Sequence, residues 1–192
     1  MTAFAVIGHL ARSDGLFSLN DLPGSGGRVD ILCRCVNASL FLSHDIRRDI
    51  VCYLILCGGE VAPKTVKFSG NLIRSLSPDE RSAGALIKKA LEIPVGSEFR
   101  GAAPGVSVRK GGLERLVTEH AFAVLDERGT DIRSTGIIPD AFLLSDHLNF
   151  TDDEELMVKE YPRFSVGPAC IHADHAITIV HNELDRRRSG WK

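Results

Sequence analysis

A chain of 192 residues is long enough to bury a substantial core, and we expect residues 1–192 to form a single domain. The hydrophobic share of 44% and the charged share of 25% exclude a disordered or fibrous protein and are typical of a soluble globular one. A net charge of −2 excludes the strongly basic composition of many nucleic-acid-binding proteins, and no apolar run is long enough to predict a membrane span.

The first half of the chain alternates between apolar runs and amphipathic segments. Residues 3–7 predict a short strand, and residues 27–42 predict a helix because their apolar side chains recur at three- and four-residue spacing. The continuous apolar run at 50–57 suits a buried parallel strand, and 65–68 suits a short one. A helix is expected over 78–91, with proline and acidic residues at its start and lysines near its end.

Shorter elements continue the alternation in the second half. We expect, in chain order, a loop at 101–105, a strand at 106–108, a helix at 111–119, strands at 122–125 and 141–144, a helix at 152–159, a strand at 164–166 and a final helix at 173–187. Strands and helices that alternate in this way predict an α/β fold with a largely parallel sheet.

Three loops follow strands in the second half, at 126–129, 145–147 and 167–170. Ligands of open α/β sheets bind beyond the carboxyl ends of the strands, so these loops are candidates for the walls of one pocket. The chain contains neither the dinucleotide-binding pattern G-x-G-x-x-G nor a G-x-x-x-x-G-K-[ST] phosphate loop. A Rossmann dehydrogenase and a P-loop nucleotidase are therefore not expected.

A glycine-rich loop, Pro23-Gly-Ser-Gly-Gly27, leads directly into the spacing Arg28-x-Asp30. Glycines allow the backbone to adopt positive φ and allow a ligand to approach closely. A carboxylate two residues from a guanidinium could form an acid–base pair at the rim of a site. The alternative is an ordinary loop whose charges cap the following helix.

Histidines and cysteines raise two further possibilities. His172 and His175 can share one helix face, but His181 lies about 240° further round at about 100° per residue, so we expect no metal site. Cys170 in a loop could be a nucleophile, yet no acid that would orient a partner histidine is evident.

The other features favour an intracellular protein. The five cysteines show no C-x-x-C spacing, and four of them lie in apolar runs that suit buried, reduced thiols. The first residues resemble a strand and not a signal peptide, which predicts a cytoplasmic location.

Several segments together resemble the archaeal tRNA pseudouridine-54 N1-methyltransferases, members of the SPOUT class of S-adenosylmethionine-dependent enzymes. The matching segments run in order along nearly the whole chain, at 18–38, 40–49, 78–82, 144–147, 166–175 and 181–185. The related ribosomal-RNA pseudouridine N1-methyltransferases share the Arg-x-Asp spacing of Arg28 and Asp30.

The resemblance implies a SPOUT fold whose C-terminal part forms a trefoil knot that holds S-adenosylmethionine. It implies a homodimer formed through the knotted region, for which the final helix supplies Ile177, Ile179 and Val180. It also places the cofactor against eight residues, Leu125, Ser145, Val166, Gly167, Pro168, Ala169, Cys170 and Ile171. The chain departs from the family pattern at Ser145, where glycine is usual, and at Ala176, where cysteine is common.

The resemblance gives the Arg28–Asp30 pair a chemical role. N1 of pseudouridine is an imide-like N–H, so methyl transfer requires its proton to be weakened or removed and the groups to be aligned. Asp30 is the candidate base or orienting acceptor, and Arg28 is the candidate partner of a phosphate or of charge on the base carbonyls. No metal is required. The alternatives are action on another RNA, such as ribosomal RNA, and a non-catalytic RNA-binding module.

Overall fold

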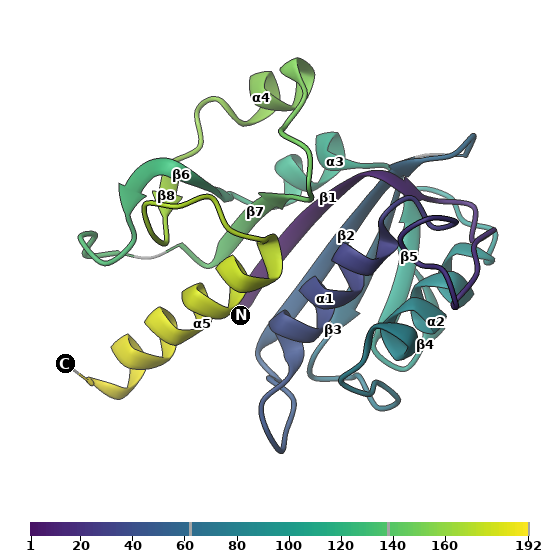
Figure 1. Ribbon diagram of the computed structural model, residues 1–192, viewed down its shortest axis with the longest axis horizontal. Coiled ribbons are helices and arrows are strands. Elements are labelled where there is room, and N and C mark those ends of the chain that lie inside the picture. The colour runs from purple at the N-terminus through teal and green to yellow at the C-terminus, as the bar shows by residue number, and fades with distance from the viewer. Residues whose placement is uncertain (62, 138, 192) are drawn as a thin grey trace.

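Eight strands form one mixed sheet in the part of the chain that the structure describes. The computed structural model describes residues 1–61, 63–137 and 139–191. The strands are β1 (Thr2–Arg12), β2 (Ile50–Gly58), β3 (Lys64–Ser69), β4 (Arg100–Ala103), β5 (Val106–Lys110), β6 (Ala123–Asp131), β7 (Ala141–Ser145) and β8 (Arg163–Ser165). Their order across the sheet is β4-β5-β3-β2-β1-β7-β6-β8 (Figure 1).

Strands β2, β1, β7, β6 and β8 pair in parallel, and β3, β5 and β4 extend the sheet with antiparallel pairs. The central strand β1 pairs on both sides, with Ala3 opposite Val51 on β2 and opposite Ala141 on β7. A parallel strand covered on both faces needs apolar side chains at nearly every position. The predicted α/β fold with a largely parallel sheet is therefore confirmed.

Helices cover both faces of the sheet. They are α1 (Val29–Leu40), α2 (Glu80–Leu91), α3 (Leu113–Glu119), α4 (Asp152–Val158) and α5 (Ala173–Ser189). Helices α1, α2 and α5 pack on one face, and the shorter α3 and α4 pack on the other (Figure 1). In the described part of the chain, no helix is both long and apolar enough to cross a membrane.

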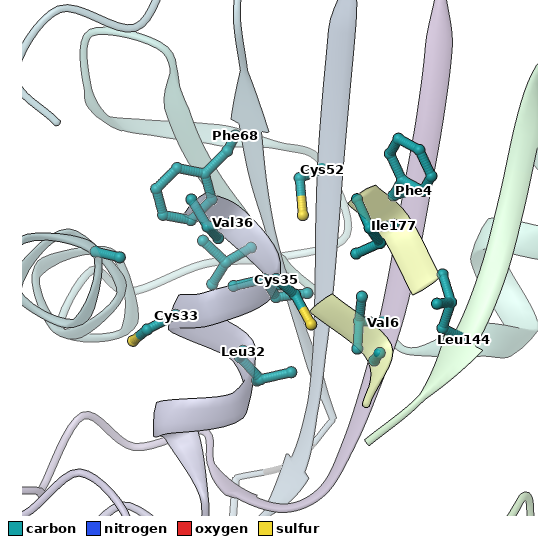
Figure 2. Close-up of a cluster of buried hydrophobic side chains, with 14 of the residues drawn as sticks. Phe4, Val6, Leu32, Cys33, Cys35, Val36, Cys52, Phe68, Leu144 and Ile177 are labelled. Atoms are coloured by element: carbon teal, nitrogen blue, oxygen red, sulfur yellow. The ribbon is translucent and has the colours of Figure 1, made fainter. Parts of the chain in front are cut away.

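The larger core lies between the sheet and helices α1, α2 and α5. Alternate residues of β1 divide between the two faces, so Phe4 and Val6 point to this core whereas Ile7 points to the other. Figure 2 shows Ile177 of α5 near Phe4 and Val6 of β1, whereas Val36 of α1 lies on the Phe68 side of the same core. This arrangement corrects one expectation: Ile177 and Val180 are fully buried within the chain itself, so they fill its core and are not free to form a dimer interface.

Side-chain caps fix the starts of two helices. The Asp79 carboxylate accepts a hydrogen bond from the backbone N–H of Ser82 at 2.7 Å, which starts α2 two residues after Pro78. Thr151 and Glu154 form a reciprocal capping box at the start of α4. Such caps satisfy N–H groups that have no partner within the helix, which is why local sequence located these helices.

Helix α1 begins at Val29, two residues later than expected, and ends at Leu40. Gly27 and Arg28 have φ values of 63° and 69°, which are left-handed and cannot belong to a right-handed helix. Only glycine is possible at position 27, because a Cβ there would lie 1.9 Å from the Leu10 carbonyl oxygen. The glycine-rich loop therefore packs directly against the end of β1.

Two loop predictions, at 101–105 and 126–129, are wrong in part, because strands cover some or all of these residues. Residues 100–103 form edge strand β4, which pairs with β5 through a turn at Gly105, although their sequence Arg-Gly-Ala-Ala has no strand preference of its own. Residues 126–129 belong to β6, which runs on to Asp131 through an irregularity: Leu125 and Thr130 both pair with Phe164. Strand pairing therefore determines the conformation of both segments, with the adjacent strand β5 for residues 100–103 and with the more distant β8 for β6.

Candidate functional site

A cavity of about 580 Å³ opens beyond the carboxyl end of β7 and beside the irregular middle part of β6. Residues of this irregular segment at 126–129 and of the loops at 145–147 and 167–170 all line it, together with residues at the start of α1 and α5. The three segments that the sequence singled out therefore do meet at one place, although the first of them belongs to a strand. Cavities of a few hundred cubic ångströms are the size that binds small molecules and cofactors.

Seven of the eight predicted cofactor residues line this cavity. They are Leu125, Ser145, Val166, Gly167, Ala169, Cys170 and Ile171, and Ala176 also lines it. Pro168 is exposed and is not among the lining residues. A Cβ built on Gly167 would meet no heavy atom within 4 Å, so the space beside this glycine is open. The Ser145 hydroxyl donates a hydrogen bond to the Leu148 carbonyl oxygen, so this side chain is already engaged within its own loop.

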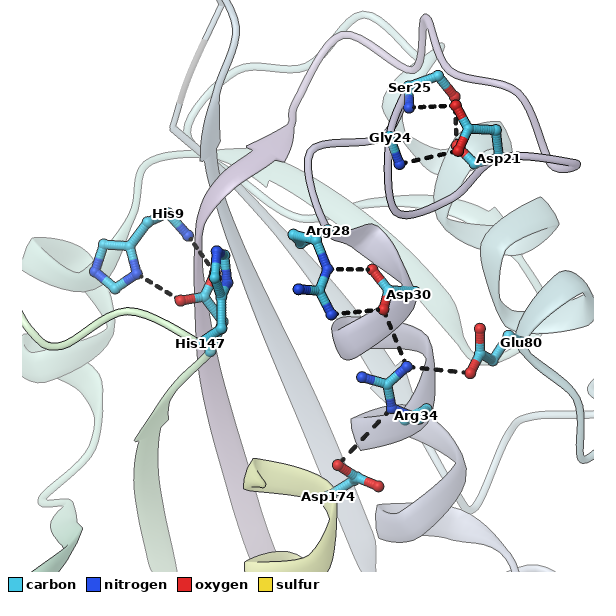
Figure 3. Close-up of polar contacts among 11 residues, drawn as sticks. His9, Asp21, Gly24, Ser25, Arg28, Asp30, Arg34, Glu80, His147 and Asp174 are labelled. Carbon is cyan, nitrogen blue, oxygen red and sulfur yellow. Dashed lines mark hydrogen bonds and ion pairs between the residues drawn. The ribbon is translucent and has the colours of Figure 1, made fainter. Parts of the chain in front are cut away.

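Arg28 and Asp30 form a bidentate ion pair at one wall of the cavity (Figure 3). Nε of Arg28 donates to Oδ1 of Asp30 at 3.0 Å, and Nη2 donates to Oδ2 at 3.0 Å. The left-handed backbone of Arg28 makes this local contact possible. Arg28 lines the cavity, whereas Asp30 is 3% exposed and lies behind it.

A second guanidinium, which the sequence interpretation missed, also binds Asp30. Arg34 donates through Nη1 to Oδ2 of Asp30 at 3.0 Å and to Glu80 at 3.2 Å (Figure 3). Its position four residues after Asp30 on a helix is the signal that could have indicated this pair. The carboxylate of Asp30 is thus held by guanidinium groups, and α1 has no side-chain cap hydrogen bond of the kind that the alternative interpretation required.

The environment of Asp30 sets its protonation. Burial raises its pKa, but hydrogen bonds from Arg28 and Arg34 and their charges more than offset this, so the pKa lies below its ordinary value. Asp30 is therefore ionised at neutral pH, and both of its oxygens are already engaged. A carboxylate in this state is a weak proton acceptor and a good anchor for the two arginines.

The loop at 126–129 is also anchored by charge. Asp126 pairs with Arg128 at 3.0 Å and with Arg163 at 2.8 Å. The hydrogen bond from Arg128 is the main cause that lowers the pKa of Asp126 to about 2. This carboxylate stays negative over the whole physiological range and fixes the loop against the start of β8.

The histidines near the C-terminus do not converge. The rings of His172 and His175 stack with their centroids 5.5 Å apart, whereas His181 is buried and its Nε2 lies 2.9 Å from the Ser39 carbonyl oxygen. Burial lowers the pKa of His181 to about 4, so it is a neutral core residue. Among the described residues, no group of three histidine, cysteine or acidic side chains is placed to hold a metal ion.

The cysteines divide as follows. Cys33, Cys35 and Cys52 are buried and Cys57 is partly buried, all as free thiols, which confirms the expectation for the first three. Burial raises the pKa of Cys52 and of Cys57 to about 12, so both are inert at neutral pH. Cys170 is exposed beside the cavity.

Comparison with known proteins decides the family. The model of a family described as "Putative SAM-dependent RNA methyltransferase" matches residues 1–189. The chain belongs to this family. Two similar relatives come from Methanocorpusculum labreanum (59% identity, 97% of this chain and 98% of the relative) and Methanospirillum hungatei (54% identity, 100% of both). Both are named tRNA (pseudouridine(54)-N(1))-methyltransferase, so the resemblance found in the sequence is confirmed.

The family fold is shared with a distant solved structure. Archaeoglobus fulgidus Nep1 bound to S-adenosylhomocysteine aligns with a TM-score of 0.62 and 16% identity, over 98% of this chain and 99% of that one. Membership of the family makes S-adenosylmethionine the methyl donor. The cavity fits such a group, because its volume suits a cofactor and the side of Gly167 is open.

Proposed function

We propose that this protein transfers a methyl group from S-adenosylmethionine to N1 of the pseudouridine at position 54 of tRNA. Full-length relatives with that name, at 54% and 59% identity, support the reaction and its substrate. The observation that carries the proposal is the cavity itself, where three strand-end loops face the guanidinium of Arg28. The cofactor lies against the loops, and the pseudouridine lies on the Arg28 side.

Seven lining residues are proposed to bind the cofactor: Leu125, Ser145, Val166, Gly167, Ala169, Cys170 and Ile171. Pro168 contributes by fixing the backbone between Gly167 and Ala169. Backbone N–H and C=O groups of these loops supply most of the hydrogen bonds, since the side chains are mainly small or apolar. The cofactor supplies an electrophilic methyl group on a sulfonium, which is a good leaving group.

Arg28 and Asp30 have different roles: Arg28 contacts the substrate, and Asp30 positions Arg28. Arg28 uses Nε and Nη2 on Asp30, which leaves Nη1 for a carbonyl oxygen of the pseudouridine ring. A cation at that oxygen stabilises the negative charge that develops as N1 loses its proton. Asp30 orients Arg28 and does not take the proton, because it is buried and both of its oxygens are engaged. The N1 proton passes to solvent water as the methyl group leaves the sulfonium for N1, so S-adenosylhomocysteine and H⁺ are the other products.

We propose further that the C-terminal part forms the trefoil knot of the SPOUT class. Membership of the methyltransferase family and a fold like that of Archaeoglobus fulgidus Nep1 support this. Residues 1–192 are proposed to act as one domain in the cytoplasm.

Methylation of a defined tRNA tests the function. Purified protein and S-adenosylmethionine are incubated with a tRNA transcript whose position 54 is pseudouridine, and the nucleosides are analysed by mass spectrometry. We expect 1-methylpseudouridine from this tRNA and none from the same transcript with uridine at 54. Methylation of a pseudouridine-containing ribosomal-RNA fragment alone would favour the other RNA, and cofactor binding without any methylation would favour a binding module.

A homodimer is proposed as the assembled form. With Ile177 and Val180 in the core of the chain, the interface must use other side chains, and the exposed Leu148, Leu156 and Ile171 lie on or near the cavity loops. Light scattering at micromolar concentration is expected to give about twice the chain mass of 20.9 kDa. A mass of one chain would contradict the proposal. Leu156→Lys should weaken the dimer, whereas Leu16→Lys, equally exposed but distant from these loops, should not.

A further inference from the structure

His9 lies between two carboxylates beside the cavity. Its Nδ1 is 2.9 Å from Oδ1 of Asp146, and its Nε2 is 3.0 Å from Oε2 of Glu154. Its backbone N–H also donates to Oδ2 of Asp146 at 3.0 Å. The Asp146 side chain is almost completely buried and lines the cavity. Both carboxylates are more than 130 residues from His9 in sequence, so the fold alone brings the three groups together. Figure 3 shows His9 beside His147, with dashed lines for its two contacts with Asp146.

Both contacts require the charged form of the ring. A neutral imidazole carries one N–H, so one of its nitrogens would present a lone pair to a carboxylate oxygen. The imidazolium carries two N–H groups and can donate to both carboxylates at once. The geometry on both sides of the ring is therefore that of a protonated histidine.

The position of His9 follows from a break in β1. Pairing with β7 ends at Ile7 opposite Ser145, and pairing with β2 shifts register between Gly8 and Arg12. An irregularity of this kind turns a side chain away from its regular direction. His9 is thereby placed next to the residue that follows β7, at the beginning of a cavity loop.

Asp146 and Glu154 also accept hydrogen bonds from the backbone of the segment that borders the cavity. Asp146 also accepts from the backbone N–H of Leu148 at 3.0 Å, which shapes the loop at 145–150. Glu154 accepts from the backbone N–H of Thr151 at 2.8 Å at the start of α4. We propose that the His9 imidazolium is a positioning residue, which holds the loop at 145–150 in its cofactor-binding form and releases it when His9 loses a proton. This rests on the proposed placement of S-adenosylmethionine in the cavity.

The surrounding charges agree with the geometry. The hydrogen bond to Asp146 raises the pKa of His9 above its ordinary value; burial opposes this, and Glu154 adds to the increase. Other titratable or charged groups near the two carboxylates are His147 on the same loop, Arg28 before α1 and Cys57 on β2; Glu114 on α3 lies near Cys57. Because the pKa is raised on folding, the stabilisation is complete below pH 6.5 and is lost as pH rises through the higher value.

Cofactor affinity as a function of pH tests the proposal. Calorimetry with S-adenosylmethionine compares the wild type, His9→Asn and the control His44→Asn between about pH 6 and 9. Since the cofactor's own amino group titrates in this range, the informative quantity is the ratio of variant to wild-type Kd at each pH. We expect His9→Asn to bind about tenfold more weakly at pH 6.5, the worth of one charge-assisted hydrogen bond, with the ratio approaching one at high pH. His44 is exposed on the loop after α1, and its variant should follow the wild type.

Nitrogen-15 NMR of the wild-type imidazoles gives a second readout that needs no variant. We expect both ring nitrogens of His9 to be protonated at pH 6.5 and one to lose its proton at alkaline pH. A Kd ratio that does not change with pH, or a neutral His9 at pH 6.5, would overturn this proposal alone. A wild type that binds no S-adenosylmethionine at any pH would overturn the placement of the cofactor and this proposal with it.

Discussion

Replacing Gly167 by leucine is expected to abolish the binding of S-adenosylmethionine while the fold remains intact. The backbone of Gly167 does not have positive φ, and a Cβ at this position meets no atom within 4 Å. Leucine can therefore be accommodated without strain in the protein. Its side chain then extends into the open space of the cavity, where the cofactor is proposed to lie.

Calorimetry and thermal unfolding together test this prediction. We expect binding to Gly167→Leu to fall below detection and the melting temperature without ligand to change by no more than a few degrees. Gly96→Leu is the matched control, because Gly96 also has open space at its Cβ and does not line the cavity. Wild-type affinity in Gly167→Leu would show that the cofactor does not bind against this loop.

Asp30→Asn is expected to lower the single-turnover rate of methyl transfer by about a hundredfold or more, the effect of losing a preorganised charge in an active site. Asparagine cannot accept two parallel hydrogen bonds from Arg28, and its amide N–H groups oppose those of the guanidiniums. Arg28 then loses its fixed direction toward the cavity. The affinity for S-adenosylmethionine should change by less than about threefold, because Asp30 does not line the cavity.

The positioning role has a signature in a double-mutant cycle. Arg28→Ala should lower the rate by a similar factor and weaken tRNA binding, because it removes the group that faces the substrate. If Asp30 acts through Arg28, then Asp30→Asn should add little in the Arg28→Ala background. Additive losses would instead give Asp30 a direct role, such as taking the proton from N1.

The free energy of unfolding of Asp30→Asn must be measured together with its rate of methyl transfer. Removal of the Asp30 charge leaves Arg28 without its partner and takes one partner from Arg34, so a loss of about 1–3 kcal/mol in the free energy of unfolding is expected. Glu80→Gln is the control, since it removes a partner of Arg34 but leaves the Arg28–Asp30 pair. A normal rate per folded molecule of Asp30→Asn, with only a lower melting temperature, would make the pair purely structural.

Sequence by itself determined the alternation of strands and helices and the class of the fold. Local chemistry was sufficient there: apolar periodicity indicated α1, and proline and acidic residues at the start with lysines near the end indicated α2, whose start the Asp79 cap fixes in the structure. The order of short motifs also sufficed for the family, and the rule that parallel strands end at one edge sufficed to bring the three loops together.

Tertiary structure alone decided the contacts within the site. Strand β4 exists because it pairs with β5, and position 27 requires glycine because its backbone packs against Leu10. From the sequence, Asp30 could be a base, an orienting acceptor or a cap; the structure shows that both of its oxygens bind guanidinium groups, of Arg28 and Arg34. His9 drew no attention in the sequence, since its partners are 137 and 145 residues away. Local patterns report on neighbours within one element, and these roles depend on charges that only the folded chain brings within hydrogen-bond distance.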